Sequence, residues 1–246
     1  MTDFKADEYD REDRSESLTR NARLSPPFWD REYWHLRAIR EFVVRALESG
    51  ARGRALDYGA GDSPYRSLFE RAGLELIAAD ITSDNSSVLK IDDEGRLPAR
   101  DGYFDLVLST QVLEHVPDVN RYLKEAHRVL RPGGMLLIST HGSFILHRHP
   151  VDLRRWTVDG LRFELEQAGF KVHRVEPHVG ILANSTHQRA FVYGGLLKRS
   201  AWTRWLRPIL FGLFNLRMAI EDWLTPPEVM EVLPSLLLVK AFKEDQ

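Results

Sequence analysis

The chain contains no cysteine. This absence excludes disulfide bridges, catalysis by a thiolate and metal sites with cysteine ligands. No run of apolar residues is long enough to span a bilayer, and the first twenty residues lack the apolar centre of a signal peptide. We therefore expect a cytoplasmic protein.

An excess of one charge is also missing. The 36 acidic and 34 basic residues give a net charge of −2, so the molecule as a whole is not expected to bind nucleic acid. The 246 residues, of which 43% are hydrophobic, are enough for one large domain or for one domain with an added subdomain.

The N-terminal part divides into a tail and a helix. Residues 1–25 mix charges and contain few apolar residues, so we predict a mobile tail. A helix is predicted to begin near Ser25 and to end at Gly50, with one apolar face that includes Phe42 and Val43.

Residues 54–176 alternate between strand-like and helix-like patterns. The helices are predicted at 118–134 and 157–170, the second with Thr157 as its N-terminal cap. The short apolar strands read RALDY, LELIAAD, VLKID, FDLVLST, MLLIST and KVHRVEP. Buried strands that alternate with helices predict an α/β fold, a doubly wound and mainly parallel sheet with helices on both faces.

The loop ALDYGAGDSPY follows the first predicted strand. Gly59 and Gly61 allow a tight turn and let a ligand approach the backbone. NAD binding needs a third glycine and a helix N-terminus for the pyrophosphate, but Pro64 stands there. S-adenosylmethionine has no phosphate, its sulfonium cation tolerates Asp57, and Asp80 has the spacing expected for a ribose contact. The loop therefore favours S-adenosylmethionine.

Four stretches together resemble a known family. They are LDYGAGDSPY, AADI, LPARDGYFDLVLSTQVLEHVPD and EAHRVLRPGGMLLIST. Their order and spacing resemble the class I S-adenosylmethionine-dependent methyltransferases, and the matching region covers residues 54–140, about half of the chain. The resemblance implies a Rossmann-like sheet of seven strands, with PSLLLVKAFK as an antiparallel last strand.

The resemblance also implies a set of cofactor-binding residues in the loops after the first four strands. The methionine end, the ribose and the adenine would be held by Asp57, Gly59, Ala60, Gly61, Tyr65, Asp80, Ile81, Asp92, Asp93, Gln111, Val112 and His115. The Pro64-Tyr65 pair departs from the commoner third glycine of this loop, a variant that occurs in the family.

Candidates for the chemistry follow the fifth strand, where HGSFILHRHPVDLRRWT contains several titratable side chains. Histidine titrates near neutral pH and is the natural base for a hydroxyl acceptor. The predicted catalytic residues are His141, His147, His149, Asp152 and Arg155. The loop resembles methyltransferases of surface-polysaccharide and glycolipid pathways.

Structural roles are open for the same loop. Asp152 and Arg155 could form an ion pair that braces it, and Trp156 could pack in the core. A metal bound by His147, His149 and Asp152 was weighed, but their spacing fits no specific template, so no metal site is predicted.

The segment 183–232 is an insertion before the last strand. From Arg189 to Arg217 it has six basic residues and no acidic one, and its aromatic residues recur at helical spacing. A basic amphipathic helix with tryptophans suits an anionic membrane surface, and the alternatives are a packed helical cap or a dimer contact.

The predicted organisation is a tail (1–25), a cofactor-binding core (26–182), the insertion (183–232) and the last strand (233–246). The predicted function is methylation by S-adenosylmethionine of a sugar hydroxyl on a glycan or glycolipid precursor. The alternatives are a small natural product or quinone-like aromatic acceptor, and a non-catalytic protein that binds the cofactor. The expected partner is the acceptor, with a peripheral membrane contact through 198–224 and a homodimer as further options.

Overall fold

The structure is a computed structural model that describes residues 20–82, 86–92, 94–148, 151–199 and 202–244. Asp93 and His149, both predicted site residues, lie outside the described residues, as does most of the predicted tail.

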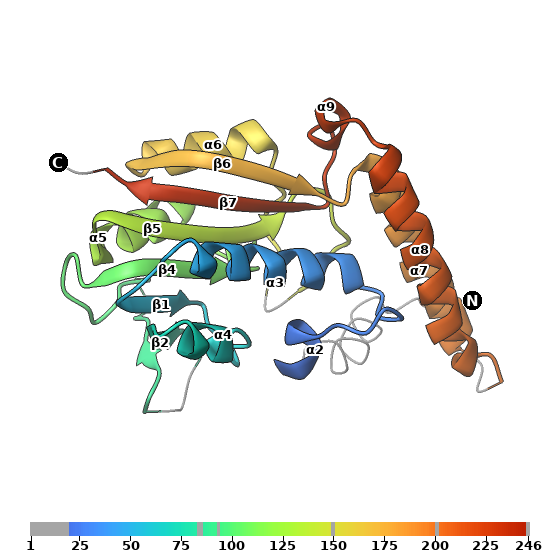
Figure 1. The fold of residues 1–246 in the computed structure, drawn as a ribbon, viewed down its shortest axis with the longest axis horizontal. Helices are drawn as coiled ribbons and strands as arrows, with labels where there is room; N and C mark the ends of the chain where they lie inside the picture. Colours follow the sequence, from blue (N-terminus) through green and yellow to red (C-terminus); the bar gives the residue numbers. More distant parts are fainter. Residues whose placement is uncertain (1–19, 83–85, 93, 149–150, 200–201, 245–246) are drawn as a thin grey trace.

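The described residues form a seven-stranded sheet in the order β3-β2-β1-β4-β5-β7-β6, which confirms the predicted fold (Figure 1). The strands β1 to β5 pair in parallel, whereas β7 pairs antiparallel with both β5 and β6. The strands are β1 Arg54–Tyr58, β2 Glu75–Asp80, β3 Leu89–Lys90, β4 Phe104–Thr110, β5 Leu130–His141, β6 Phe170–His178 and β7 Leu236–Lys243.

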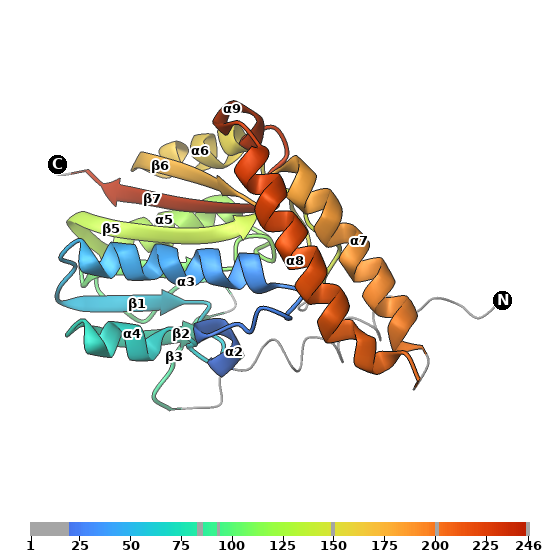
Figure 2. The same ribbon diagram turned by 45° about the vertical axis from the view of Figure 1, so that its right-hand side comes forward.

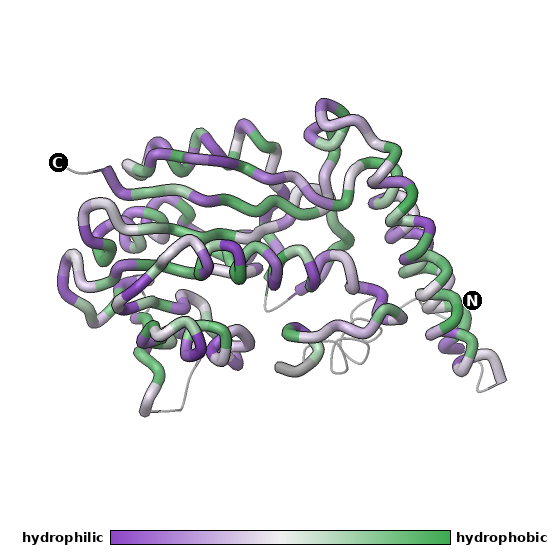
Figure 3. Tube along the Cα trace, in the orientation of Figure 1, coloured by the Kyte–Doolittle hydropathy of each residue, from purple (hydrophilic) through white to green (hydrophobic). Residues whose placement is uncertain are grey.

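Helices cover both faces of the sheet, as continuous apolar strands require. The core on one face includes residues of α5 (Val119–Val129) and α6 (Val158–Gln167), and the core on the other includes residues of α3 (Tyr33–Glu48) and α4 (Arg66–Arg71). Thr157 caps α6 as predicted, because its side chain accepts a hydrogen bond from the backbone of Gly160. Figure 3 shows hydrophobic residues along the central strands between these layers.

Two N-terminal predictions differ from the structure. The helix predicted from Ser25 begins only at Tyr33, because the preceding prolines form a turn in which the amide of Asp30 bonds to the carbonyl of Pro27. A short helix, α2 (Arg20–Leu24), lies within the segment predicted as a tail, and Leu24 packs against the core.

The third predicted strand is shorter than expected. Only Leu89 and Lys90 pair with β2, because the side chain of Asp92 accepts hydrogen bonds from the amides of Glu94 and Arg96 and closes a turn.

Between β6 and β7 the chain forms a helical hairpin, residues 181–224. It consists of α7 (Ile181–Lys198), a 3₁₀ turn η1 (Arg204–Leu206) and α8 (Arg207–Leu224), and it is followed by the short α9 (Pro227–Met230). Pro208 stands in the first turn of α8, where proline is tolerated, so it starts this helix. Figures 1 and 2 show α7 and α8 side by side beyond the carboxyl ends of the parallel strands.

Polar and apolar contacts fasten this hairpin to the core. The side-chain amide of Asn215 donates to the carbonyls of Phe28 and Asp30, each at 2.7 Å, and the indole of Trp34 donates to the carbonyl of Asn215. Met218 packs with Val179 in a small apolar cluster. The hairpin is therefore held at the end of the sheet where ligands of α/β proteins bind.

Candidate active site

The loop after β1 forms a backbone cradle. Gly59 and Gly61 have φ angles of +81° and +49°, a region that side chains disfavour. A Cβ at Gly59 would lie 2.6 Å from a methyl group of Val112, so the loop and the chain after β4 are in close contact here. Gly61 has open space instead. The structure thus brings Gly59, Ala60, Gly61 and Val112 together.

Asp57 lies beneath this cradle at the end of β1. Its side chain is buried, and its Oδ2 has no hydrogen-bond partner among the described residues. Burial raises the pKa of the carboxyl to about 7. A buried carboxylate oxygen without a partner is costly, and a cationic ligand group beside the loop would relieve that cost.

Asp80 ends β2 beside the same loop. Its Oδ2 accepts a hydrogen bond from the amide of Gly61 at 2.8 Å, and its Oδ1 accepts from the amide and the hydroxyl of Thr82. The carboxylate therefore fixes the loop, and its Oδ2 keeps one lone pair for a ligand hydroxyl. Ile81 is 57% exposed and offers an apolar surface next to it.

Three further predicted cofactor residues differ in their surroundings. Gln111 follows β4 with a φ of +57°, unusual for a residue other than glycine, and its side chain donates to the hydroxyl of Ser139. Tyr65 is buried in the core beneath the loop, next to α4, so the structure gives it a packing role. Asp92 is exposed and closes the turn after β3.

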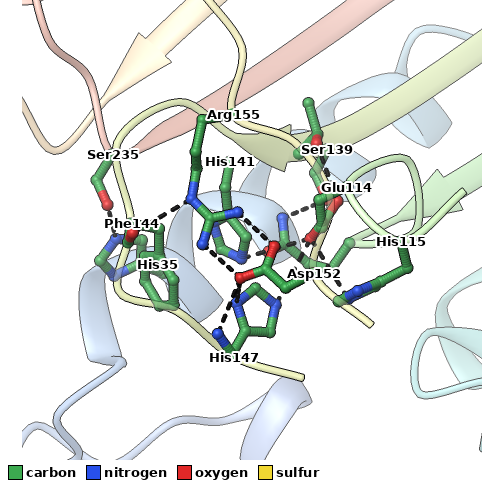
Figure 4. A network of polar contacts seen from close by, with 12 residues as sticks. His35, Glu114, His115, Ser139, His141, Phe144, His147, Asp152, Arg155 and Ser235 are labelled. Atoms are coloured by element: carbon green, nitrogen blue, oxygen red, sulfur yellow. Dashed lines mark hydrogen bonds and ion pairs between the residues drawn. The ribbon is translucent and has the colours of Figure 1, made fainter. Parts of the chain in front are cut away.

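Glu114 is the centre of a second group of side chains, which lies after β4 and β5, where the sequence predicts the acceptor side of the site (Figure 4). It follows β4 and is fully buried. Its Oε1 lies 3.5 Å from Nε2 of His141 and 4.0 Å from Nε2 of both His115 and His147. Its Oε2 accepts a hydrogen bond from Thr140 at 2.9 Å. Three imidazoles thus face one carboxylate oxygen, which has no hydrogen-bond partner among the described residues.

Burial dominates the acid–base properties of this group. It raises the pKa of Glu114 to about 7, and it lowers the pKa of His141 well below its usual value, an effect to which nearby His147 adds. Nδ1 of His141 is buried and has no hydrogen-bond partner in the described part of the chain. Burial therefore keeps His141 neutral, and the tautomer with its hydrogen on Nε2, toward Glu114, leaves the lone pair of the buried Nδ1 without a donor.

The loop 142–157 is braced by an ion pair. Arg155 contacts both oxygens of Asp152, at 2.5 and 2.6 Å, and also donates to the carbonyls of Phe144 and Ile145. Asp152 accepts a further bond from the amide of His147. Burial raises the pKa of Asp152, but these bonds outweigh it and the pKa is lowered. The structure therefore places Asp152 and Arg155 as the brace that positions His147.

Phe144 separates this group from the hairpin. Its ring stacks on His141 with centroids 3.9 Å apart and lies 5.4 Å from the ring of His187 on α7. His35 of α3 contacts the edge of the same ring, and its Nε2 lies 2.8 Å from the hydroxyl of Ser235. Asn184 of α7 donates to the carbonyl of Ser143. The acceptor side is thus walled by aromatic rings from three parts of the chain.

Two groups of side chains have the donor atoms that several divalent ions use, although no metal site was predicted from the sequence. In each group, the donor atoms lie within 4.8 Å of one another. The groups are Glu32, His35 and His187, and Glu114, His115 and His147.

The sequence model of the methyltransferase domain family matches residues 31–175, more than half of the chain. The chain belongs to the class I S-adenosylmethionine-dependent methyltransferases. The loop after β1 fits that cofactor in two respects. Gly59 and Gly61 leave the backbone bare, and the buried Asp57 oxygen has no hydrogen-bond partner among the described residues, so it can face a cationic group.

Curated relatives of this methyltransferase cover part of it. It is 30% identical over 121 residues to a ubiquinone biosynthesis O-methyltransferase of Bradyrhizobium sp. The alignment covers 42% of this chain and 48% of that protein. It is 29% identical over 166 residues to a protein of Mycolicibacterium smegmatis named "Probable S-adenosylmethionine-dependent methyltransferase", with 61% and 64% covered. The alignments span between about half and just under two thirds of these relatives.

Solved structures share the methyltransferase fold at low identity. A proposed sarcosine dimethylglycine methyltransferase from Galdieria sulphuraria has a TM-score of 0.55 and 17% identity, covering 85% of this chain and 86% of that one. The [4+2]-cyclase SpnF has a TM-score of 0.52 and 16% identity, covering 83% and 81%. Because the second is named for a different reaction, the fold alone does not define the chemistry.

Sequence reasoning missed part of the acceptor side. Glu114 is not among the predicted site residues, although the Glu114-His115 pair shortly after a predicted strand is a visible signal. Phe144, His35 and His187 gave no signal, because single aromatic or histidine residues on helices and loops are ordinary core residues.

Proposed function

We propose that this methyltransferase methylates a hydroxyl group on a planar, quinone-like aromatic acceptor. The carrying observation is the Glu114–His141 pair, a buried carboxylate oxygen 3.5 Å from one imidazole nitrogen while the other nitrogen has no hydrogen-bond partner among the described residues. Such a pair can remove the proton of a hydroxyl, which an acceptor oxygen must lose during methylation.

The roles of the chain's residues follow from this geometry. S-adenosylmethionine supplies the activated methyl group, and the protein must align the acceptor and take its proton. Nδ1 of His141 accepts the proton, and Glu114 stabilises the resulting imidazolium from the opposite side of the ring. The separation of 3.5 Å is longer than a hydrogen bond, and such contacts commonly tighten when the acceptor binds.

Two observations favour an aromatic acceptor. The ring of Phe144, stacked between the buried rings of His141 and His187, is itself partly exposed and offers an aromatic edge to a planar molecule. Curated relatives are named as ubiquinone biosynthesis O-methyltransferases. A phenolic hydroxyl, with a pKa of about 10, is also a better match for an imidazole–carboxylate base than a less acidic alcohol. The sugar hydroxyl suggested by the loop motif stays a prediction.

The test is a transfer assay with S-adenosylmethionine and two acceptor sets, catechol-type phenols and hexopyranosides, in which the demethylated cofactor is measured by mass spectrometry. We expect turnover with phenols. Turnover with sugars alone would reverse the choice of acceptor. Binding of the cofactor without transfer to either set would support the non-catalytic alternative.

The base assignment has its own test. His141→Gln should lower turnover by about 10²- to 10⁴-fold while cofactor affinity is kept. His127→Gln is the matched control, since His127 is a partly buried histidine that packs on Phe170, away from this group. Full activity in His141→Gln would refute the assignment.

A further inference from the structure

The helix α8 of the hairpin carries two apolar stripes. The inward stripe contains Phe211 and Met218, which are buried. The second stripe faces solvent, and its side chains are 51–82% exposed: Ile209, Leu213, Leu216, Ile220, Trp223 and Leu224. Their spacing of three and four residues places them on one side of the helix. Single exposed apolar residues are common on protein surfaces, but a continuous row of this length marks a contact surface.

The turn between the two helices extends this surface. Trp202 and Trp205 are 86% and 65% exposed, and on α7 Val192 and Leu196 are more than half exposed. Tryptophan is the residue that most often sits at the boundary between lipid headgroups and acyl chains.

The charge of the hairpin differs from that of the remaining chain. The hairpin, residues 181–224, contains six basic residues and the two acidic residues Glu221 and Asp222, a charge of +4, so with a net charge of −2 for the whole chain the remainder carries −6. Among the basic residues, Arg199, Arg204 and Arg217 are exposed next to the apolar stripe and the tryptophans.

We infer that the hairpin docks on an anionic lipid surface, with the α8 stripe and the two tryptophans of the turn in the headgroup region. The charge argues for this occupant, because negative lipid headgroups attract a hairpin with a charge of +4, whereas a second copy of the same face would bring two positively charged hairpins together. In the part of the chain that the structure describes, no helix is long and apolar enough to cross a bilayer. The hairpin therefore lies in the plane of the interface.

This surface is distinct from the residues assigned to methyl transfer, and the inference does not depend on the proposed acceptor. The inner side of α7 carries Asn184 and His187, which contact the loop and ring at the acceptor side. The exposed stripe belongs to α8 and faces away from them. Failure of lipid binding and failure of methyl transfer are thus separate results.

The test is sedimentation of the full chain with vesicles of phosphatidylcholine, alone or mixed with phosphatidylglycerol. We expect binding to the mixed vesicles, weaker binding to phosphatidylcholine, and a loss of binding as sodium chloride screens the charges. Tryptophan fluorescence should be quenched by brominated lipid in the mixed vesicles, because the indoles enter the headgroup region.

Two variants assign the binding to the surface. The triple variant Leu213→Ser, Leu216→Ser, Ile220→Ser and the double variant Arg199→Glu, Arg204→Glu should each lower vesicle binding by at least about tenfold. Phe163→Ser is the control, because Phe163 is 60% exposed but lies on α6. All variants should bind the demethylated cofactor as the wild type does, which shows that they are folded.

Two results would overturn the inference. The first is a wild-type chain that does not bind mixed vesicles at low salt. The second is a wild-type dimer in analytical ultracentrifugation that the triple variant dissociates while vesicle binding stays unchanged, since this would make the stripe an interface between copies.

Discussion

The cofactor side and the acceptor side of this site are assembled in opposite ways. The cofactor side consists of consecutive residues, 57–61, which offer bare glycine backbone and one buried carboxylate oxygen for the cofactor to approach. The acceptor side gathers side chains from distant parts of the chain, since His187 and Glu32, 155 residues apart, lie in contact behind Phe144. A loop of consecutive residues can be recognised in the sequence, whereas a cluster of side chains from distant segments forms only when the chain folds.

The two sides also differ in what burial does. On the cofactor side, burial leaves one oxygen of Asp57 without a partner, which a ligand can supply. On the acceptor side, burial holds Glu114 and three imidazoles together and raises the pKa of the carboxyl toward neutral pH. The first arrangement suits binding, and the second suits proton transfer.

The largest expected effect is a loss of turnover without a loss of cofactor affinity, in a variant of Glu114. Glu114→Gln keeps the shape of the side chain but removes the charge behind His141, so turnover should fall by about 10²- to 10⁴-fold. Cofactor affinity, measured by calorimetry, should stay within about twofold, because the polar contacts of the Glu114 side chain are with Thr140 and three imidazoles, none of which belongs to the loop 57–61. An equal loss of affinity would mean that the two sides are coupled.

Although Glu114→Gln should lower turnover, it should raise the stability of the folded protein at high pH. The folded protein retains the Glu114 proton up to a pH of about 7, whereas an unfolded chain releases it near 4.5, so the free energy of unfolding falls as the pH rises between these values. Glu114→Gln removes this loss and should be more stable than the wild type at pH 8, by up to about 3 kcal/mol. Thermal unfolding at pH 4 and pH 8 measures the difference. A variant that is less stable at pH 8 would contradict the buried, high-pKa carboxyl.

The pH dependence of turnover should reflect the ionisation of Glu114. Glu114 must be ionised to support His141, so turnover is expected to rise with pH through about 7 and then to level off. A pH profile of kcat between pH 5.5 and 9 checks this. A flat profile, with chemistry shown to limit the rate, would indicate transfer without a base.

On the cofactor side, a matched pair of glycines gives a smaller effect. Gly59→Ala adds a Cβ 2.6 Å from a Val112 methyl group as well as backbone strain, whereas Gly61→Ala adds the strain alone. The strain costs about 1–2 kcal/mol, so Gly61→Ala should weaken cofactor binding by about tenfold and Gly59→Ala by more. Adding Val112→Ala to Gly59→Ala should restore part of the affinity. Equal losses in the two single variants would show that the loop adapts.

The smallest effect is expected at the brace of the acceptor loop. Arg155→Lys cannot contact both oxygens of Asp152, and it also loses the bonds to Phe144 and Ile145. We expect kcat to fall by about three- to tenfold, with an unchanged pH profile, because Arg155 positions the loop and carries no proton. A shifted pH profile in this variant would instead place Arg155 in the proton transfer.

The fold could be predicted from the sequence because it depends on local patterns, and the alternating strands and helices predicted the sheet correctly. The ribose contact predicted for Asp80 stays a prediction, and its hydrogen bond to the amide of Gly61 was not predicted. The start of α3 was placed eight residues early, because Ser25 and the prolines after it resemble a helix start but form a turn. Residue preferences show where a helix can begin, but the hydrogen bonds that the backbone forms there determine where the helix begins.

The acceptor side could be predicted only in part. His141, His147 and Asp152 were named from one loop, and the structure brings them together, but the central position of Glu114 depends on how β4 and β5 pair. His35 and His187 join the same wall because α3 and the hairpin pack against the sheet ends. The spacing of residues in the sequence does not predict that His35 and His187 pack together.

The position of α7 has a consequence for how such an enzyme can diversify. One side of this helix touches the acceptor loop through Asn184 and His187, while the glycine cradle lies on other elements. Substitutions on α7 can therefore alter which molecule is accepted while the inherited cofactor machinery stays intact. The hairpin between β6 and β7 contains none of the residues of the glycine loop, so the two parts of the site can vary independently.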